Sequence, residues 1–327
     1  MERFIMNKHL VSVCRYETPI ESVKKTVEMC GGMDFFKKGS KVFIKPNIVF
    51  WTMDVEFPKY GVITTSRTIH DMIVILKDSG IDDITIIEGS VALDPKQTNA
   101  KSAHAFKTLG YNDLARRYGI MTMNVFERPF KTVDLGGDVV LKMNADILDS
   151  DLVVDIPVMK THVQTHVSLG IKNLKGLISL ESRKKCHNPD PAKDLHFHVA
   201  RLSDKMPPVF SLLDGIYTAE YGPNVDGRMH RGNILVGSKD IFAADKVGAL
   251  LLGQEPNNVP HLVHYAKNHQ RPMDLSDVQV VGENITELAK YHEPFFPWTE
   301  DHEMPAALKK KGFKGLAYRR YDLTVCT

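Results

Sequence analysis

Basic and imidazole side chains are concentrated in one short segment that follows an apolar run. The segment holds Lys160, His162, His166, Lys172 and Lys175. A His can act as a general base because its ordinary pKa lies near neutrality. A Lys can bind an anion, and burial in apolar surroundings would depress its pKa and make it nucleophilic. The segment therefore predicts a site for an anionic ligand, with His162 and Lys172 as catalytic candidates and Lys160, Lys172 and Lys175 as ligand-binding candidates.

The same histidines allow a different interpretation. His162 and His166 are four residues apart, which would place them on one face of a helix, and His187 adds a third imidazole downstream. Imidazole is a common metal ligand, so these three residues are candidates for a divalent-metal site without an organic cofactor. A His pair at this spacing fits a solvated helix face equally well.

Polar residues also follow two earlier apolar runs and begin the strongest helical pattern. In an open α/β sheet, ligands bind where strands end and helices begin, because loops meet there and the first N–H groups of a helix are unpaired. These residues are therefore candidates for holding a carboxylate, a phosphate or a cofactor, with ordinary helix capping as the alternative for the hydroxyl groups. The candidates are Lys45, Asn47, Thr64, Thr65, Ser66, Glu88 and Ser90, with Asn173 from the basic segment.

The elements that would position these residues follow an alternating order. Short runs rich in Val and Ile, such as 10–14, 42–44, 84–87 and 152–156, are separated by helical patterns such as 66–79. That order is typical of parallel strands joined by crossover helices. The sequence predicts an α/β fold with a mainly parallel sheet and flanking helices, whose strand ends at Lys45, Glu88 and Lys160 build one crevice.

Two further features of the sequence add to this predicted α/β fold. Residues 120–142 carry three strand-like patches separated by Pro129 and a Gly pair, which predict a β insertion in the form of a meander or hairpin. Pro207-Pro208 suggests a boundary between lobes. The predicted parts are a main α/β lobe at 1–206 with the ligand crevice, a smaller α/β portion at 207–292 and a C-terminal appendage at 293–327.

Charge, apolar content and cysteine spacing indicate which partners, location and cofactors to expect. The chain has 327 residues and a formal net charge of +2, from 42 basic and 40 acidic residues, so the total charge favours neither nucleic acid nor an anionic membrane as a partner. The sequence shows neither a long apolar span nor a secretion signal, so a cytoplasmic location is the expectation. Cys14, Cys30, Cys186 and Cys326 are scattered without a C-x-x-C pair, so no iron–sulfur cluster is expected.

Several of these motifs together resemble a known family. Lys45-Pro46-Asn47, Thr64-Thr65, Lys160-Thr161-His162, Lys172-Asn173-Leu174-Lys175-Gly176 and Asp214-Gly215 are similar to the bacterial and archaeal domain-of-unknown-function family 362. The resemblance runs from about residue 41 to 283. Some members of that family carry ferredoxin-type modules, but this chain has no Cys-rich module.

The basic segment is also distantly similar to the nickel-pincer lactate racemases. That resemblance implies an acid/base role for His162, a Lys172 that tethers a pincer-type nucleotide, and His187 as a nickel ligand. This chain departs from the racemase pattern at two places. A Gly-Gly-Arg-Lys turn is replaced by Leu169-Gly170-Ile171-Lys172, and a second acid/base His is replaced by Ser90-Val91.

The resulting hypothesis is an enzyme that binds an anionic small molecule or a nucleotide-like cofactor. Its reaction would be racemase-like or oxidoreductase-like on a hydroxy acid. The alternatives are a non-catalytic binding or accessory protein for a phosphorylated ligand or cofactor, and a His-ligated metal protein. The sequence leaves the oligomeric state open, with a homodimer as one alternative.

Overall fold

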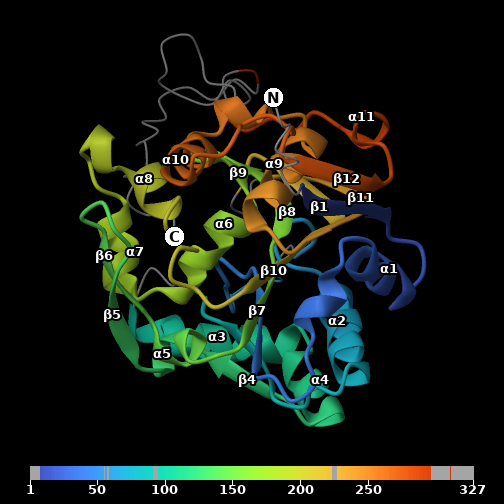
Figure 1. Cartoon of the computed structure of the whole chain (residues 1–327). Coiled ribbons are helices and arrows are strands. Elements are labelled where there is room, and N and C mark those ends of the chain that lie inside the picture. The colour runs from blue at the N-terminus through green and yellow to red at the C-terminus, as the bar shows by residue number, and fades with distance from the viewer. Residues whose placement is uncertain are drawn as a thin grey trace.

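A mostly parallel sheet with helices on both faces forms the centre of the protein (Figure 1). The computed structural model describes residues 8–54, 56, 59–90, 95–222, 227–295 and 310. The predicted α/β fold class is confirmed within these residues. The helices are α1 (Glu21–Met29), α2 (Ser66–Asp78), α3 (Thr98–Thr108), α4 (Tyr111–Tyr118), α5 (Ala145–Leu148), α6 (Gly170–Asn173), α7 (Leu180–Cys186), α8 (Leu195–Val199), α9 (Ile241–Leu251), α10 (Pro260–His269) and α11 (Ile285–Leu288).

The strand order places the early and middle strands side by side at the parallel end of the sheet. From one edge to the other the strands are β12 (Val278–Gly282), β1 (His9–Arg15), β11 (Arg228–Ser238), β10 (Val209–Glu220), β7 (Leu152–Ile156), β2 (Val42–Pro46), β3 (Ile84–Glu88) and β4 (Met121–Asn124). The pairs from β10 to β4 are all parallel, whereas β11 runs antiparallel to both β10 and β1. The carboxyl ends of β2, β3 and β7 therefore lie at one edge.

Alternation of side chains along each strand divides the core between the two faces of the sheet. Val42 and Ile44 of β2 pack in a cluster with residues of α1 and α2, whereas Phe43 belongs to a second cluster with residues of α6 and α9. Successive side chains of a strand point to opposite faces, so a strand covered on both faces must be apolar throughout. This explains the continuous apolar runs in the sequence.

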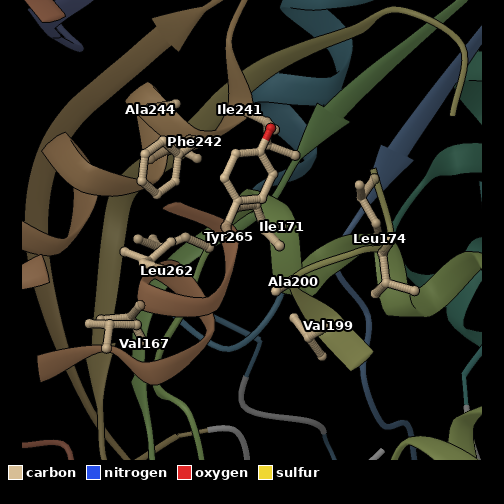
Figure 2. Packing of buried hydrophobic residues seen from close by; sticks show 14 of the residues in the cluster. Val167, Ile171, Leu174, Val199, Ala200, Ile241, Phe242, Ala244, Leu262 and Tyr265 are labelled. Atoms are coloured by element: carbon tan, nitrogen blue, oxygen red, sulfur yellow. The ribbon is translucent and has the colours of Figure 1, made fainter. Parts of the chain in front are cut away.

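The second cluster fixes the short helix α6, which carries Lys172. Figure 2 shows Ile171 of α6 beside Tyr265 of α10 and Phe242 of α9. The rings of Phe242 and Tyr265 stack with their centroids 4.7 Å apart. A helix of one turn is not stable by itself, so this packing holds α6 in place.

The predicted β insertion at 120–142 is only partly correct. Its first patch forms β4, which lies parallel to β3 at the edge of the main sheet after the crossover through α3 and α4. The other two patches form the separate antiparallel hairpin of β5 (Phe130–Asp134) and β6 (Val140–Asn144). The prediction of a meander was wrong for β4 because four residues of strand carry no sign of the partner to which they pair.

The predicted helix face shared by His162 and His166 was also wrong. His162 ends β8 (Val158–His162) and His166 begins β9 (His166–Ser168), and these residues face each other across an antiparallel hairpin. His166 has a positive φ of 59°, a conformation that the four-residue spacing does not reveal. β8 also pairs with β10, so this hairpin is part of the main sheet.

The predicted division into lobes stays a prediction. Strands β10, β11 and β12, from the predicted smaller portion, continue the same sheet as β7 and β2. Most of the predicted appendage at 293–327 lies outside the described residues. No helix within the described residues is both long enough and apolar enough to cross a membrane.

Candidate functional site

A buried ion pair joins the ends of two neighbouring strands. Lys45 lies near the end of β2 and Glu88 is the last residue of β3, and their side chains are almost completely buried. The Lys45 Nζ donates to Glu88 Oε2 at 2.5 Å, to the Pro46 carbonyl at 2.6 Å and to Asn173 Oδ1 at 3.3 Å. The parallel pairing of β2 with β3 brings these residues together, as strand ends at Lys45 and Glu88 predicted.

A chain of buried polar groups extends from this pair. Asn173 donates from Nδ2 to Asp155 Oδ1 at 2.8 Å and accepts from Asn47 Nδ2 at 2.9 Å. Lys160 Nζ donates to Asn47 Oδ1 at 2.8 Å and to the Val62 carbonyl at 2.7 Å. These bonds hold the loop after β2 against β8 and α6. The predicted ligand-binding residues Asn47, Lys160 and Asn173 are therefore brought together, with bonds to one another and to buried protein groups.

Asp155 is a buried acid within this network. Burial raises the pKa of its carboxyl well above the ordinary value, although the nearby Lys45 charge lowers it. Its Oδ2 has no hydrogen-bond partner among the residues that the structure describes. Burial therefore favours the neutral form of this carboxyl more than it would for an exposed acid.

A small cationic crevice opens beside the Lys45–Glu88 pair. Its volume is about 30 Å³. Among the described residues that line it, four are cationic and one is a carboxylate, so the wall carries an excess of positive charge. The described lining residues are Lys45, Asn47, Val49, Glu88, Gly89, Ser168, Lys172, Asn173, Lys175, Gly176 and Arg183.

Gly176 allows this crevice to form. A Cβ atom at Gly176 would lie 2.5 Å from Lys45 Cε, 2.6 Å from its Nζ and 3.0 Å from Glu88 Oε1. These distances are shorter than van der Waals contact, so a larger residue would push the ion pair apart. The glycine in the Lys175-Gly176 motif thus has a packing role at the site.

His162 is a buried neutral base next to the lysines. Its Nδ1 accepts from the backbone N–H groups of Gln164 at 3.0 Å and Thr165 at 3.3 Å, so the ring proton is on Nε2. Burial, together with the charges of Lys172 and Lys160, lowers its pKa well below the ordinary value. His162 is not among the described residues that line the crevice.

The predicted hydroxyl ligands of the strongest helix lie at a different place. Thr64 Oγ1 donates to the Ile156 carbonyl at 2.6 Å, the Thr65 N–H donates to Asp214 Oδ2 at 2.6 Å, and Ser66 Oγ donates to the Leu109 carbonyl at 2.8 Å. These three residues line a second, larger cavity. The structure thus does not bring them into the Lys172 crevice.

The remaining candidates have other partners. Ser90 is buried, and its N–H donates to Ser102 Oγ at 3.0 Å. Lys175 Nζ donates to His187 Nε2 at 2.7 Å, which occupies that ring nitrogen. The described residues contain no group of three or more His, Cys, Asp or Glu side chains arranged to hold a metal, and the metal roles of His162, His166 and His187 stay predictions.

Sequence reasoning missed two residues at or near the site. Arg183 of α7 lines the crevice, donates to the Gly176 carbonyl at 2.6 Å and has a pKa lowered to about 10 by burial. It stands next to Lys184 and Lys185, and a run of exposed basic residues concealed it. The second, His261 of α10, is fully buried, and neither of its ring nitrogens has a hydrogen-bond partner within the described part of the chain.

His261 leads to a testable prediction about stability. Burial and the neighbouring His196 and Lys172 lower its pKa well below the ordinary value, so it is a neutral ring with two unsatisfied polar atoms. Such atoms cost about 1–3 kcal/mol. His261→Leu is expected to raise the free energy of unfolding by about that amount in urea denaturation at pH 7.

A matched variant tests whether the missing hydrogen bonds cause this gain. His198 is also largely buried, but its Nδ1 lies 2.8 Å from the Asp194 carbonyl. His198→Leu is expected to lower the free energy of unfolding by about 1 kcal/mol. A loss of stability in both variants would contradict the interpretation of His261 as an unsatisfied group.

The fold and the site define a class of protein: an α/β protein with a buried, cationic crevice at the carboxyl ends of parallel strands. The model of the family described as "Domain of unknown function (DUF362)" matches residues 42–250, which include every residue of that crevice. The chain therefore belongs to the DUF362 family.

Three individual proteins are similar to this chain at low sequence identity. The "Thylakoid-associated protein sll1697" of Synechocystis sp. is 23% identical over 245 residues, which cover 74% of this chain and 72% of that protein. A crystal structure of a Thermotoga maritima protein is similar with a TM-score of 0.42 and 17% identity, covering 74% of this chain and 61% of that one. The lactate racemase apoprotein of Thermoanaerobacterium thermosaccharolyticum is similar with a TM-score of 0.39 and 15% identity, covering 74% and 57%. The chain spans about three fifths of the length of these two structures.

Proposed function

We propose that this protein binds a small carboxylate or other oxyanion in the crevice and acts on it as an enzyme. One observation carries the proposal: four cationic side chains and a single carboxylate line a buried cavity. Lys and Arg side chains that converge on one cavity form charge-assisted hydrogen bonds to carboxylate and phosphate oxygens. Such a lining favours an anionic ligand over a neutral one.

The size of the crevice limits the ligand. A volume of about 30 Å³ has room for roughly two water molecules, so only the anionic group of a ligand such as a hydroxy acid would enter the crevice, with the rest of the ligand outside it. Ligand sites for larger organic molecules typically have about 300–1,000 Å³. A pincer-type nucleotide on Lys172 is too large for this crevice, and Lys175 Nζ lies 2.7 Å from His187 Nε2. No step is therefore assigned to that cofactor.

Lys172 lines the crevice, so its replacement tests anion binding there. Loss of one charge-assisted hydrogen bond costs about 1.5–3 kcal/mol, or about 10- to 100-fold in affinity. Lys172→Met is expected to weaken the binding of lactate and of inorganic phosphate by that factor in isothermal titration calorimetry. Lys185→Met is the control, because this exposed side chain of α7 donates to the Val140 carbonyl outside the crevice.

Either of two results would refute the crevice as the anion site. One is equal weakening by the Lys172 and Lys185 variants, which would indicate nonspecific attraction. The other is a covalent mass on natively purified protein that disappears in Lys172→Met. That mass, found by intact-protein mass spectrometry, would favour a tethered cofactor over a small anion.

His162 distinguishes an enzyme from a binding protein. A neutral imidazole can accept a proton, and a hydroxy acid held beside Lys172 would be a substrate for racemase-like or oxidoreductase-like chemistry. His162→Asn keeps a side-chain oxygen for the N–H groups of Gln164 and Thr165. In an enzyme this variant is expected to abolish deuterium exchange at Cα of lactate in heavy water while affinity changes less than about twofold. Absence of exchange in both proteins would favour the accessory role.

A further inference from the structure

A second cavity lies between the start of α2 and the turn that joins α3 to α4. Its volume is about 530 Å³, within the range of about 300–1,000 Å³ that small-molecule sites occupy. It shares no described lining residue with the crevice at Lys172. Its described lining residues are Lys59, Tyr60, Ile63, Thr64, Thr65, Ser66, Arg67, His70, Leu109, Gly110, Leu114 and Arg117.

The wall of this cavity is positively charged. Lys59, Arg67 and Arg117 line it, and no carboxylate is present among its described lining residues. Within the described part of the chain, none of these three cations forms a salt bridge. Arg117 lies over the Tyr118 ring with its Cζ 5.3 Å from the centroid, and Lys59 lies over the Tyr60 ring at 5.7 Å. Their charges are therefore available to an anion.

His70 adds a positioned polar group to the same wall. Its Nδ1 is 3.0 Å from Asp71 Oδ1, and its Nε2 is 2.7 Å from the Tyr118 hydroxyl. Asp71 also accepts from the Tyr16 hydroxyl at 2.7 Å. These bonds fix the imidazole and keep the Asp71 carboxylate behind it, fully buried and outside the lining.

One side of the cavity is apolar and aromatic. The Tyr60 side chain is 52% exposed, and its ring packs against Tyr217 with centroids 4.7 Å apart. Leu109 and Leu114 line the same cavity. An exposed aromatic ring supported from behind offers a face on which a planar group can stack.

We propose that this cavity binds a phosphorylated organic ligand of nucleotide size. Arg67, Arg117 and Lys59 would hold the phosphate, because guanidinium groups form paired charge-assisted hydrogen bonds to phosphate oxygens. Tyr60 would support a planar ring. The volume leaves room for both parts of the ligand, which the crevice at Lys172 does not. This site is independent of the anion site proposed above.

Titration calorimetry with AMP and with inorganic pyrophosphate tests this proposal. The wild-type protein is expected to bind AMP, and Arg67→Ala and Arg117→Ala are each expected to weaken it at least about tenfold. Arg116→Ala is the matched control, because Arg116 lies on the same helix, forms an ion pair with Asp113 and does not line the cavity. Both arginines of the cavity are exposed, so their removal is expected to leave the fold intact, which thermal denaturation checks.

Two further variants locate the ligand within the protein. Tyr60→Ala is expected to weaken AMP but not pyrophosphate, and Lys172→Met is expected to leave AMP affinity within about twofold. Absence of AMP binding at millimolar concentration, or equal losses in Arg116→Ala and Arg117→Ala, would overturn the proposal. Loss of AMP binding in Lys172→Met would instead place the nucleotide in the crevice and would also overturn it.

Discussion

Replacing Glu88 by Ala is expected to lower the free energy of unfolding by about 3–5 kcal/mol. The variant leaves the Lys45 ammonium group fully buried without its counter-charge. It also removes the acceptor of the Gly89 N–H, which donates to Glu88 Oε1 at 2.8 Å. Urea denaturation followed by circular dichroism measures the loss, because the protein loses helix and sheet on unfolding.

Two control variants separate the cost of an unpaired buried charge from the general effect of removing an acid. Glu181 pairs with Lys142 at 2.7 Å on the surface, and Glu181→Ala is expected to change the free energy of unfolding far less than Glu88→Ala, because water screens an exposed pair. A double variant, Lys45→Met with Glu88→Leu, is expected to recover part of the stability that Glu88→Ala loses. A cost for Glu88→Ala no larger than that for Glu181→Ala would show that Lys45 does not depend on this partner.

The convergence of Lys45 and Glu88 could be predicted because it depends only on strand type. Short apolar runs such as 42–44 indicate parallel strands covered on both faces. The ends of adjacent parallel strands meet at one edge, so polar residues that follow such runs come together. Asn47 and Lys160 entered the same network for this reason.

The hairpin of His162 and His166 could not be predicted from the same kind of pattern. A four-residue interval fits one turn of helix as well as a tight turn between strands, and this segment lacks a glycine to mark the turn. The deciding factor is the pairing of β8 with β10, which comes from a part of the chain about 50 residues away. The residues around His162 and His166 do not by themselves indicate that long-range pairing.

The location of the helix start at Thr64, Thr65 and Ser66 could also be predicted only in part. The sequence indicated that they begin a helix after a strand, which the structure bears out for α2. It did not indicate the direction in which the helix leaves the sheet. The described lining of the larger cavity combines this helix start with Leu109, Gly110 and Leu114, and these residues come together only when α2 packs beside α4.

Asp245 is a titratable group that accepts hydrogen bonds from the start of α6, the helix that carries Lys172. It lies on α9, fully buried, and its two oxygens accept the N–H groups of Gly170 at 2.7 Å and Ile171 at 2.9 Å, at the start of α6. A Cβ at Gly170 would lie 2.9 Å from Asp245 Oδ1, so this approach requires glycine. Burial raises the pKa of Asp245 to about 7.

The raised pKa determines the direction of the pH effect. Between pH 3.8 and about 7 the folded protein keeps a proton on Asp245 that the unfolded chain has released, so this group favours folding at low pH. Its contribution disappears as the pH rises through about 7. The full difference is about 4 kcal/mol, because each pKa unit corresponds to about 1.4 kcal/mol. Buried His162 and His261 act in the opposite direction, since their lowered pKa values reduce stability as the pH falls.

Comparison of Asp245→Asn with the wild-type protein isolates this one group, because both proteins keep the same histidines. In the variant the NH2 group of Asn replaces one of the two oxygens and faces a backbone N–H donor, so one hydrogen bond is lost. The variant is therefore expected to be less stable than the wild-type protein at pH 4. The variant should then gain up to about 4 kcal/mol relative to the wild-type protein as the pH rises to 8. Urea denaturation at half-unit intervals of pH measures this difference. A difference that stays constant across the range would mean that Asp245 titrates in the folded protein as it does in the unfolded chain, and that the position of α6 does not depend on its proton.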